Sequence, residues 1–372
     1  MEKVIGIIDG TGGNYDSSTL ETTGLGGSET WTVQLSMQFK SRGYHVIIFN
    51  GTDNWHFDKY GIEWVPLNLF KSRIKYQSFD RIIISRIYNG YIDAINKESC
   101  CWNIYVQAHD VGIGQFDWEN NCYPKLNGEG ELFQRGVKKV IALSEWHIES
   151  LNHIWNDIPR DMIEIIPDGI DPELFKDIRL DNHRDNGILF SSRPERGMEL
   201  LCNKILPELR KVVEDAKVYL ASYNDIPKEY YGREDEGIYV LGKLNKIELY
   251  KEMSKHKVWF YPSIFPETFN ITLCENIMCG CIPVLPLIHG MATTLRNFNK
   301  LGIDHEFYNP WYTHNGNDDL AVKDSVQMLS GWMNNWDNYA TYILRDSMRN
   351  FIIENYSWSK VADLWENLFN KY

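Results

Sequence analysis

Short runs of apolar residues alternate with longer amphipathic segments along most of the chain. In the first half these runs are rich in Ile and Val and lack the strict apolar–polar alternation of a half-exposed strand. Uninterrupted runs of this kind are typical of strands that are buried on both faces of a parallel sheet. The pattern predicts strands at residues 4–9, 45–50, 81–85, 103–108, 140–144 and 163–167.

The clearest helix is predicted between the first two strands, at residues 28–42. Trp31, Leu35 and Phe39 recur there at helical spacing, and Gly43 follows as a stop signal. Strands that alternate with helices in this way indicate an α/β fold in which helices cover a mostly parallel sheet.

The pattern is interrupted at DGIDPELFKDIRLDNHRDNG (168–187), which is polar, acidic and poor in strand-forming residues. It then resumes, and strands are predicted at residues 188–192, 217–222, 237–242, 257–263 and 281–286. Beyond residue 317 the chain is predicted to be mostly helical. The last helix, at 357–372, is expected to present one apolar face made of Trp358, Val361, Leu364, Trp365 and Leu368.

We therefore predict two Rossmann-like, doubly wound α/β domains. The first spans residues 1–170, a linker follows at 171–187, and the second domain spans 188–356. A C-terminal helix at 357–372 completes the chain.

Composition narrows the class of protein. The chain has 372 residues, of which 43% are hydrophobic, and a formal net charge of −13, which argues against a general nucleic-acid binder. Its seven cysteines include no C-x-x-C pair, so we expect a reduced, cytoplasmic protein without structural zinc. No apolar run approaches the roughly 20 residues that span a bilayer. The basic segment KSRIK (71–75) is interpreted as a solvated face; a peripheral membrane contact is the alternative, and the overall acidity argues against it.

The segment FPETFNITLCENIMCGCIPV (265–284) carries two glutamates eight positions apart, Glu267 and Glu275. It should form a loop and a short helix after a strand, at the edge where doubly wound sheets bind ligands. A helix N-terminus suits a phosphate, whereas carboxylates suit hydroxyl donors such as those of a ribose and a sugar. The spacing alone is equally compatible with a loop Glu267 and an ordinary exposed Glu275.

This whole segment resembles the E-x7-E segment of the family-4 retaining glycosyltransferases, which have the two-domain GT-B fold with a central cleft. The resemblance extends to the leading Phe-Pro, the Glu-Asn-Ile-Met helix and the Cys-Gly-Cys-Ile-Pro-Val exit. It implies that Glu275 accepts hydrogen bonds from the ribose hydroxyls and that Glu267 lies against the transferred sugar. It also implies that backbone N–H groups around Thr268, Phe269 and Asn270 meet sugar and phosphate.

Residues 23–49 resemble the N-terminal glycine loop of the same family, in which Gly26 and Gly27 let the backbone approach the donor closely. The alternative is a dinucleotide-binding turn, but G-x-G-x-x-G would require glycine where Glu29 stands. The following strand also ends in Asn50 rather than an acidic residue. A dehydrogenase is therefore disfavoured.

Two further segments resemble donor-binding turns of the family. SSRPERGMELL (191–201) would place Arg196 and, as a second candidate, Arg193 on the donor diphosphate, where guanidinium groups suit oxyanions. Solvated arginines at the start of a surface helix are the alternative. GKLNKIELYKEM (242–253), with Lys243, would pack on the nucleotide base.

YVQAHDVG (105–112) places His109 directly after a predicted strand. A single histidine is usually structural, but this position resembles the family's histidine near the reacting carbon of the donor sugar. IIPDGIDPELF (165–175) matches the segment that leads into the linker, and we interpret Asp168 as a mark of that linker. The C-terminal helix commonly crosses back to the first domain in this fold.

The resemblance implies a retaining glycosyltransferase in which His109, Glu267 and Arg196 are catalytic. The donor would be a nucleotide sugar such as a UDP- or GDP-sugar, and the acceptor a glycan or another hydroxyl compound. No D-x-D motif occurs, so we expect transfer without a metal and without any other cofactor. The acceptor would bind the first domain, where Trp55, Trp64 and Trp118 are candidates for stacking on a sugar.

Three alternatives stay open at this point. A nucleotide-sugar epimerase or a phosphorylase shares the fold, a non-catalytic nucleotide-sugar-binding module lacks turnover, and a dehydrogenase would bind a nicotinamide cofactor.

Overall fold

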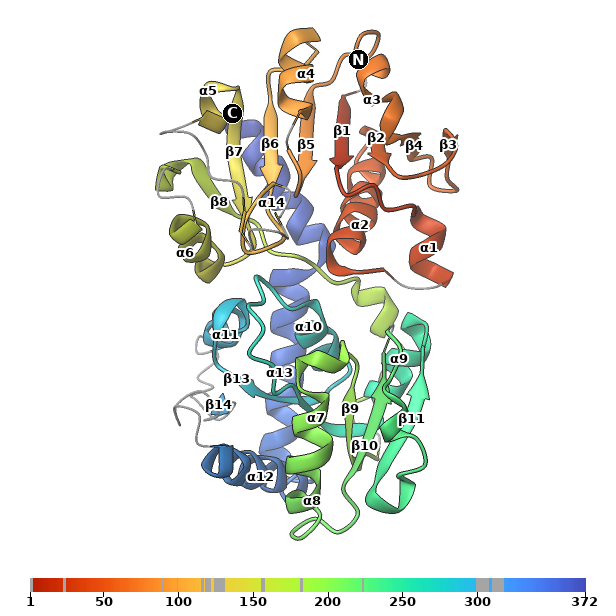
Figure 1. Ribbon diagram of the computed structural model, residues 1–372, viewed down its shortest axis with the longest axis vertical. Coiled ribbons are helices and arrows are strands. Elements are labelled where there is room, and N and C mark those ends of the chain that lie inside the picture. Colours follow the sequence, from red (N-terminus) through yellow and green to blue (C-terminus); the bar gives the residue numbers. More distant parts are fainter. Residues whose placement is uncertain are drawn as a thin grey trace. The chain divides into compact units, whose positions relative to one another are not determined.

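The computed structural model describes residues 3–22, 25–88, 90–98, 100–114, 117, 122–123, 131–154, 158–180, 183–222, 224–298, 308–309 and 318–372. The chain divides into two compact units (Figure 1). The first comprises Met1–Gly169, Glu267–Phe269 and Trp358–Tyr372, and the second comprises Ile170–Pro266 and Asn270–Ser357.

The first unit is built on an eight-stranded sheet with the order β3-β4-β2-β1-β5-β6-β7-β8. Its neighbouring strands are parallel except for β3, which pairs antiparallel with β4 at the edge. At the centre of the sheet Ile7 pairs with Ile48 on one side and Ile83 on the other. The strands are β1 (Val4–Asp9), β2 (His45–Asn50), β3 (His56–Phe57), β4 (Glu63–Pro66), β5 (Arg81–Ser85), β6 (Ile104–Gln107), β7 (Val137–Ala142) and β8 (Ile163–Ile165).

Helices cover both faces of this sheet, and each face has its own apolar core. Ile7 and Ile8 lie in different clusters of buried residues, because successive side chains of a strand point to opposite faces. The helices are α1 (Ser17–Thr22), α2 (Gly27–Ser41), α3 (Phe70–Arg73), α4 (Tyr91–Glu98), α5 (Glu131–Gln134), α6 (Glu145–Ile154) and α14 (Trp358–Lys371), with 3₁₀ turns η1 (Leu67–Leu69) and η2 (Arg160–Met162).

Helix α14 belongs to the first unit, where it packs beside α2. Arg42, just after α2, forms ion pairs with Glu366 and with Asp363, the latter at 2.8 Å. The expected apolar face is wrong at one position: Leu364 is 40% exposed. Ala362 and Phe369 are buried instead, because the stripe of buried residues runs through positions 358, 361, 362, 365, 368 and 369.

The second unit is built on a parallel six-stranded sheet with the order β11-β10-β9-β12-β13-β14. Its strands are β9 (Asp185–Phe190), β10 (Lys217–Ala221), β11 (Ile238–Gly242), β12 (His256–Phe260), β13 (Ile282–Pro286) and β14 (Tyr308–Asn309). The longer helices are α9 (Lys246–Met253), α10 (Ile271–Met278), α11 (His289–Asn297), α12 (Asp318–Asn334) and α13 (Tyr339–Tyr356). Short helical segments are η3 (Pro172–Phe175), η4 (Pro194–Arg196), α7 (Met198–Leu200), the π-helical turn η5 (Leu201–Ile205), α8 (Leu206–Leu209), η6 (Lys228–Tyr230) and η7 (Glu234–Glu236).

The predicted end of the linker, at residue 187, is wrong. Strand β9 begins at Asp185, inside the polar segment that we assigned to the linker. The strand could not be recognised from its polar composition. Asp185 is tolerated at its start because its Oδ1 is paired with Nδ1 of His256, the first residue of β12, at 2.7 Å.

Candidate functional site

Helix α10 starts just beyond the carboxyl end of β12, as the sequence predicts. The side-chain Oδ1 of Asn270 accepts a hydrogen bond from the backbone N–H of Leu273 at 2.8 Å, so Asn270 is the N-cap. Gly280 follows the helix with φ +81, a left-handed conformation that favours glycine at a helix end. The first N–H groups of α10 have no intrahelical acceptor, so this end of the helix suits an anion.

Glu275 is buried in the second turn of α10, with 5% of its surface exposed. Its Oε1 accepts a hydrogen bond from Tyr250 Oη at 2.7 Å and a charged one from Lys246 Nζ at 2.9 Å. Burial of a carboxylate is costly unless it is paired in this way. The alternative of an ordinary exposed glutamate is therefore excluded.

Arg196 lies beside the segment that leaves β12. Its guanidinium carbon is 3.9 Å from the centroid of the Phe265 ring, two residues before Glu267. The turn around Arg196 depends on Gly197, which has φ +106, and a Cβ there would lie 2.9 Å from Pro262 Cγ. Arg193 occupies the N-cap position of the same 3₁₀ turn, so both predicted arginines belong to one short element.

Lys243 follows the carboxyl end of β11. It is mostly exposed, and its Nζ lies 3.8 Å from Asp225 Oδ1. Its place near the nucleotide base stays a prediction.

The segment Glu267–Phe269 groups with the first unit. Thr268 Oγ1 donates a hydrogen bond to the backbone carbonyl of His109 at 2.6 Å, and its own carbonyl accepts one from Ser144 Oγ at 2.7 Å. Thr268 and Phe269 are buried, while Glu267 is half-buried. The predicted residues His109 and Thr268 are thus in direct contact.

His109 lies just after β6, with its ring edge-on to Trp31 at 5.0 Å between centroids. Its Nε2 is buried and has no hydrogen-bond partner among the described residues. Burial, and then the positive charge of Arg86, hold the pKa of His109 well below its usual value. The imidazole is therefore neutral at pH 7 and can accept a hydrogen bond or a proton.

Arg86 was missed at the sequence level. It directly follows β5 with φ +63, and the bond from Ile87 N–H to the Ser85 carbonyl (2.8 Å) closes a tight γ-turn around it. Its Nε donates to Asp110 Oδ2 at 2.8 Å and its Nη1 to Ser28 Oγ at 3.3 Å. Burial alone would lower the pKa of Arg86, but Asp110 more than offsets this and raises it. A strained non-glycine residue at the ligand edge of a sheet is typical of functional sites.

His147 was also missed. The backbone N–H of Leu143 donates to its Nδ1 at 3.1 Å, so the ring proton must be on Nε2, which donates to the Asp110 carbonyl at 2.8 Å. Burial lowers the pKa of His147 to about 4, in agreement with this neutral form. His147 therefore fixes the backbone turn that carries His109. Arg86 could have been predicted from its place directly after a buried strand. His147 could not, because its ring bonds to backbone groups of Leu143 and Asp110, which leave no pattern in the sequence.

Gly26 and Gly27 form the entrance to α2. Gly26 is the N-cap with φ −65, which any residue can adopt, and a Cβ there would meet only the side chain of Glu29, at 2.6 Å from Oε2. The backbone conformation at these two positions does not require glycine. That the glycines let the backbone approach a ligand closely stays a prediction.

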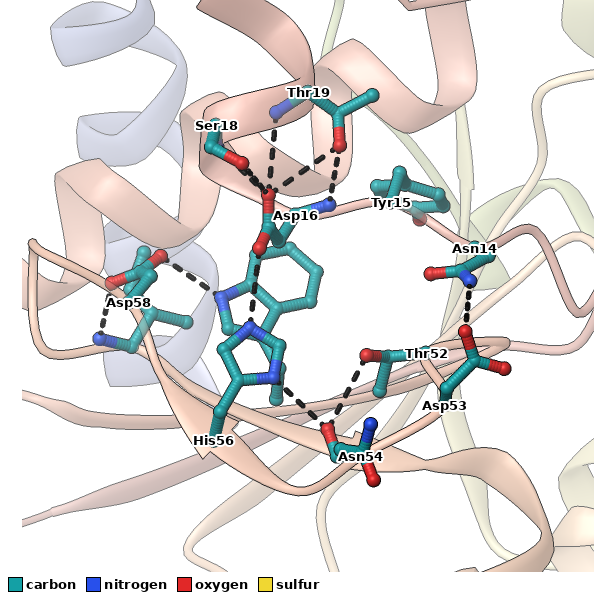
Figure 2. Close-up of polar contacts among 12 residues, drawn as sticks. Asn14, Tyr15, Asp16, Ser18, Thr19, Thr52, Asp53, Asn54, His56 and Asp58 are labelled. Carbon is teal, nitrogen blue, oxygen red and sulfur yellow. Dashed lines mark hydrogen bonds and ion pairs between the residues drawn. The ribbon is translucent and has the colours of Figure 1, made fainter.

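The loops that follow β1 and β2 carry a network of polar side chains (Figure 2). His56 bridges this network, with Nε2 3.1 Å from Asp16 Oδ2 and Nδ1 2.9 Å from the Asn54 carbonyl. Asn14 donates to Asp53 Oδ2 at 2.9 Å on the other side of the loops. The network ties the two loops to each other at the carboxyl edge of the first sheet.

The tryptophan candidates for acceptor stacking differ in their surroundings. Trp64 is fully buried and donates from Nε1 to Asp58 Oδ2, so its prediction is wrong. Trp55 is 57% exposed, with the guanidinium carbon of Arg73 5.2 Å from its ring centroid. Trp118 lies outside the described residues.

Within the described ranges, no group of three or more His, Cys, Asp or Glu side chains has a geometry that could hold a metal ion. Nor does this part of the chain contain a helix of sufficient length and apolarity to cross a membrane.

No protein-family model matches the sequence, and no curated protein matches it either. Solved glycosyltransferase structures are nevertheless similar in fold. A glycosyltransferase from Rickettsia africae ESF-5 has a TM-score of 0.70 at 15% identity, over 100% of this chain and 98% of that one. Anabaena Alr3699/HepE, solved in complex with UDP, has a TM-score of 0.64 at 12% identity over 100% of both chains.

AviGT4, a glycosyltransferase involved in avilamycin A biosynthesis, also has a TM-score of 0.64 at 12% identity, over 99% of this chain and 97% of that one. At such identities the similarity establishes architecture. The protein has the two-domain α/β fold of the GT-B type, as predicted.

Proposed function

We propose that the protein is a retaining glycosyltransferase that moves a sugar from a nucleotide-diphosphate sugar to a hydroxyl group of a glycan or another acceptor. The observation that carries this proposal is Glu275, a buried carboxylate at the carboxyl edge of the second sheet, whose Oε1 is paired with Lys246 and Tyr250. This edge is where doubly wound sheets bind ligands. A UDP-sugar is the preferred donor, because Alr3699/HepE has also been solved with UDP-glucose.

The donor diphosphate would be bound by the second unit. Arg196 and Arg193 supply guanidinium groups on one turn, and the start of α10 supplies backbone N–H groups without intrahelical acceptors. These groups would also stabilise the charge that develops on the leaving diphosphate. We therefore propose that transfer requires neither a metal ion nor another cofactor.

Retention at the reacting carbon would follow from a same-face displacement, in which the leaving phosphate helps to deprotonate the acceptor hydroxyl. The proposed role of Glu267 is to bind hydroxyls of the transferred sugar. The neutral imidazole of His109 would accept a hydrogen bond from the same sugar. Both roles rest on the resemblance of these segments to family-4 enzymes. The cytoplasmic location stays a prediction.

A thermal-shift screen with UDP, GDP, ADP and their common sugar conjugates tests the donor site. A ligand at 100 times its dissociation constant adds about 2.7 kcal/mol, which raises the midpoint by several degrees. We expect the uridine series to stabilise the protein and Glu275→Gln to abolish most of that shift. Glu229→Gln, an exposed position in the same unit, should keep it. No shift with any nucleotide would overturn the proposal.

Two other functions would give different results once a donor has been found. An epimerase would convert the nucleotide sugar without an acceptor, and a binding module would bind the donor without any turnover. Product analysis with and without candidate acceptors separates both from a transferase. Analysis of the anomeric configuration of the product tests retention.

A further inference from the structure

We propose that Lys246 and Tyr250 are positioning residues that hold Glu275 as a fixed acceptor for ribose hydroxyls, and that they thereby set the preference of the site for ribonucleotides. This inference rests on the proposed donor site. It adds two residues to which neither the sequence motifs nor the comparisons assign a role.

Both donors converge on a single oxygen of the carboxylate. Lys246 and Tyr250 are four residues apart on α9, so they lie on the same face of that helix. Each contacts Oε1 of Glu275, at 2.9 Å and 2.7 Å respectively. Among the described residues, no hydrogen bond reaches Oε2. One oxygen is thus used to hold the carboxylate, and the other is left to accept hydrogen bonds from a ligand.

The two donors differ in what they contribute. Tyr250 is buried and packs on Phe175, with 4.4 Å between the ring centroids, so its hydroxyl has a fixed position. Burial, followed by the nearby charge of Glu275, raises the pKa of Tyr250 well above its usual value, and the hydroxyl stays a donor at any physiological pH. Lys246 keeps 21% of its side chain exposed and supplies a positive charge that compensates the carboxylate.

The orientation of α9 supports this role. Asn245 caps the helix and exchanges hydrogen bonds with Glu248 in a capping box, at 3.0 Å in both directions. The capping box fixes the first turn, and Lys246 is the first residue of that turn. The ammonium group is therefore presented to Glu275 by a rigid element.

A carboxylate held in a fixed position discriminates between ligands that do and do not have hydroxyl donors. A site with a buried acceptor for a hydroxyl group binds an analogue without that hydroxyl much more weakly, because the acceptor is then left unpaired. An apolar pocket loses far less affinity for such an analogue. Without the Tyr250 hydroxyl the carboxylate of Glu275 can rotate, so the ribose hydroxyls contribute less to the affinity for the nucleotide. The affinity for a nucleotide without these hydroxyls should hardly change.

The experiment is calorimetric titration of the full-length protein with UDP and with its 2′,3′-dideoxy analogue. We expect the wild type to prefer UDP by about 10-fold or more, as for hydrogen bonds to charged groups. Tyr250→Phe should weaken UDP binding by roughly that factor, leave the dideoxy analogue nearly unchanged, and so remove the preference. Lys246→Met should act in the same direction, with partial rescue by Lys246→Arg.

Two controls separate positioning from general damage. Tyr230→Phe alters another buried tyrosine of the same unit, one that does not contact Glu275, and should preserve the preference for UDP. In a Glu275→Gln background, Tyr250→Phe should have little further effect, because the two residues act as one unit.

Each remaining outcome has a distinct meaning. Equal weakening of both ligands by Tyr250→Phe, or an unchanged preference, would overturn the positioning role while the donor site stands. If the wild type binds UDP but does not prefer it over the dideoxy form, Glu275 does not contact the ribose and this inference fails alone. If the wild type binds no nucleoside diphosphate, the proposed function and this inference fail together.

Discussion

The carboxyl group of Asp168 is buried, and its Oδ1 has no hydrogen-bond partner among the described residues. Burial raises the pKa of Asp168 from 3.8 to about 8. The folded protein thus binds this proton more tightly than the unfolded chain does. The contribution of Asp168 to the free energy of unfolding is therefore greatest below about pH 4. This contribution decreases as the pH rises toward 8, because the folded protein must then bury a charged carboxylate.

Asp168→Asn should remove this pH dependence. The variant should gain stability relative to the wild type as the pH rises from 5 to 8, by at most about 1.4 kcal/mol per pH unit. Thermal unfolding at pH 5, 6.5 and 8 measures the difference. The exposed control Asp177→Asn should leave the pH profile of the wild type unchanged. A constant difference between Asp168→Asn and the wild type would contradict the expectation.

His109 gives a second prediction at this scale. His109→Ala should lower kcat by about 10²-fold or more if the imidazole contacts the reacting sugar, while the affinity for UDP changes little. Steady-state kinetics together with UDP titration separate the two quantities. A comparable loss of both would indicate that His109 only supports the backbone turn that it forms with Asp110, to which Thr268 is hydrogen-bonded.

The sequence singled out Arg196 because it follows a buried strand, and Glu275 because its segment resembles a known motif. Their roles stay predictions. Arg86 also follows a buried strand, β5. The partners Lys246 and Tyr250 could not be predicted, because they meet Glu275 only through the packing of α9 against α10. The buried state of Asp168 is likewise set by packing and leaves no trace in a polar sequence.

At the level of elements, apolar runs predicted strands accurately where both faces are buried. The bounds of β1, β2 and β5 are those predicted. Strand β4 was missed because it contains Glu63, whose buried carboxylate pairs with His45 at 2.9 Å and Arg73 at 2.8 Å. Ionic pairing between distant segments conceals a buried strand from any hydropathy pattern.

Helix α14 provides the prediction for this scale. Trp365 is fully buried among Trp31, Tyr105 and Phe369, so Trp365→Ala should destabilise the first unit by about 3–5 kcal/mol. Leu364→Ala, one residue earlier but 40% exposed, should cost less than about 0.5 kcal/mol. Urea unfolding followed by tryptophan fluorescence compares the two. Similar effects of both substitutions would mean that α14 does not pack through the face described.

At the scale of the whole molecule, the repeated buried runs in both halves predicted two α/β domains, and the GT-B fold confirms this. The segments joining elements were harder to predict, since their stability comes from side-chain pairs rather than from periodic burial. The net charge of −13 has a consequence at this scale, because it repels an anionic donor at long range. Binding of a diphosphate must therefore depend on a local concentration of positive groups.

The last prediction concerns these groups. Because Arg193, Arg196 and the start of α10 are proposed to neutralise the diphosphate, transfer by the purified protein should be unaffected by EDTA. Arg196→Ala should lower kcat/KM by about 10²-fold or more, as expected when a charged contact that strengthens in the transition state is removed. Added Mg²⁺ should not restore this variant. Transfer that stops in EDTA and resumes with Mg²⁺ would show that a metal ion, rather than these arginines, stabilises the leaving diphosphate, and the assignment of Arg196 would have to be abandoned.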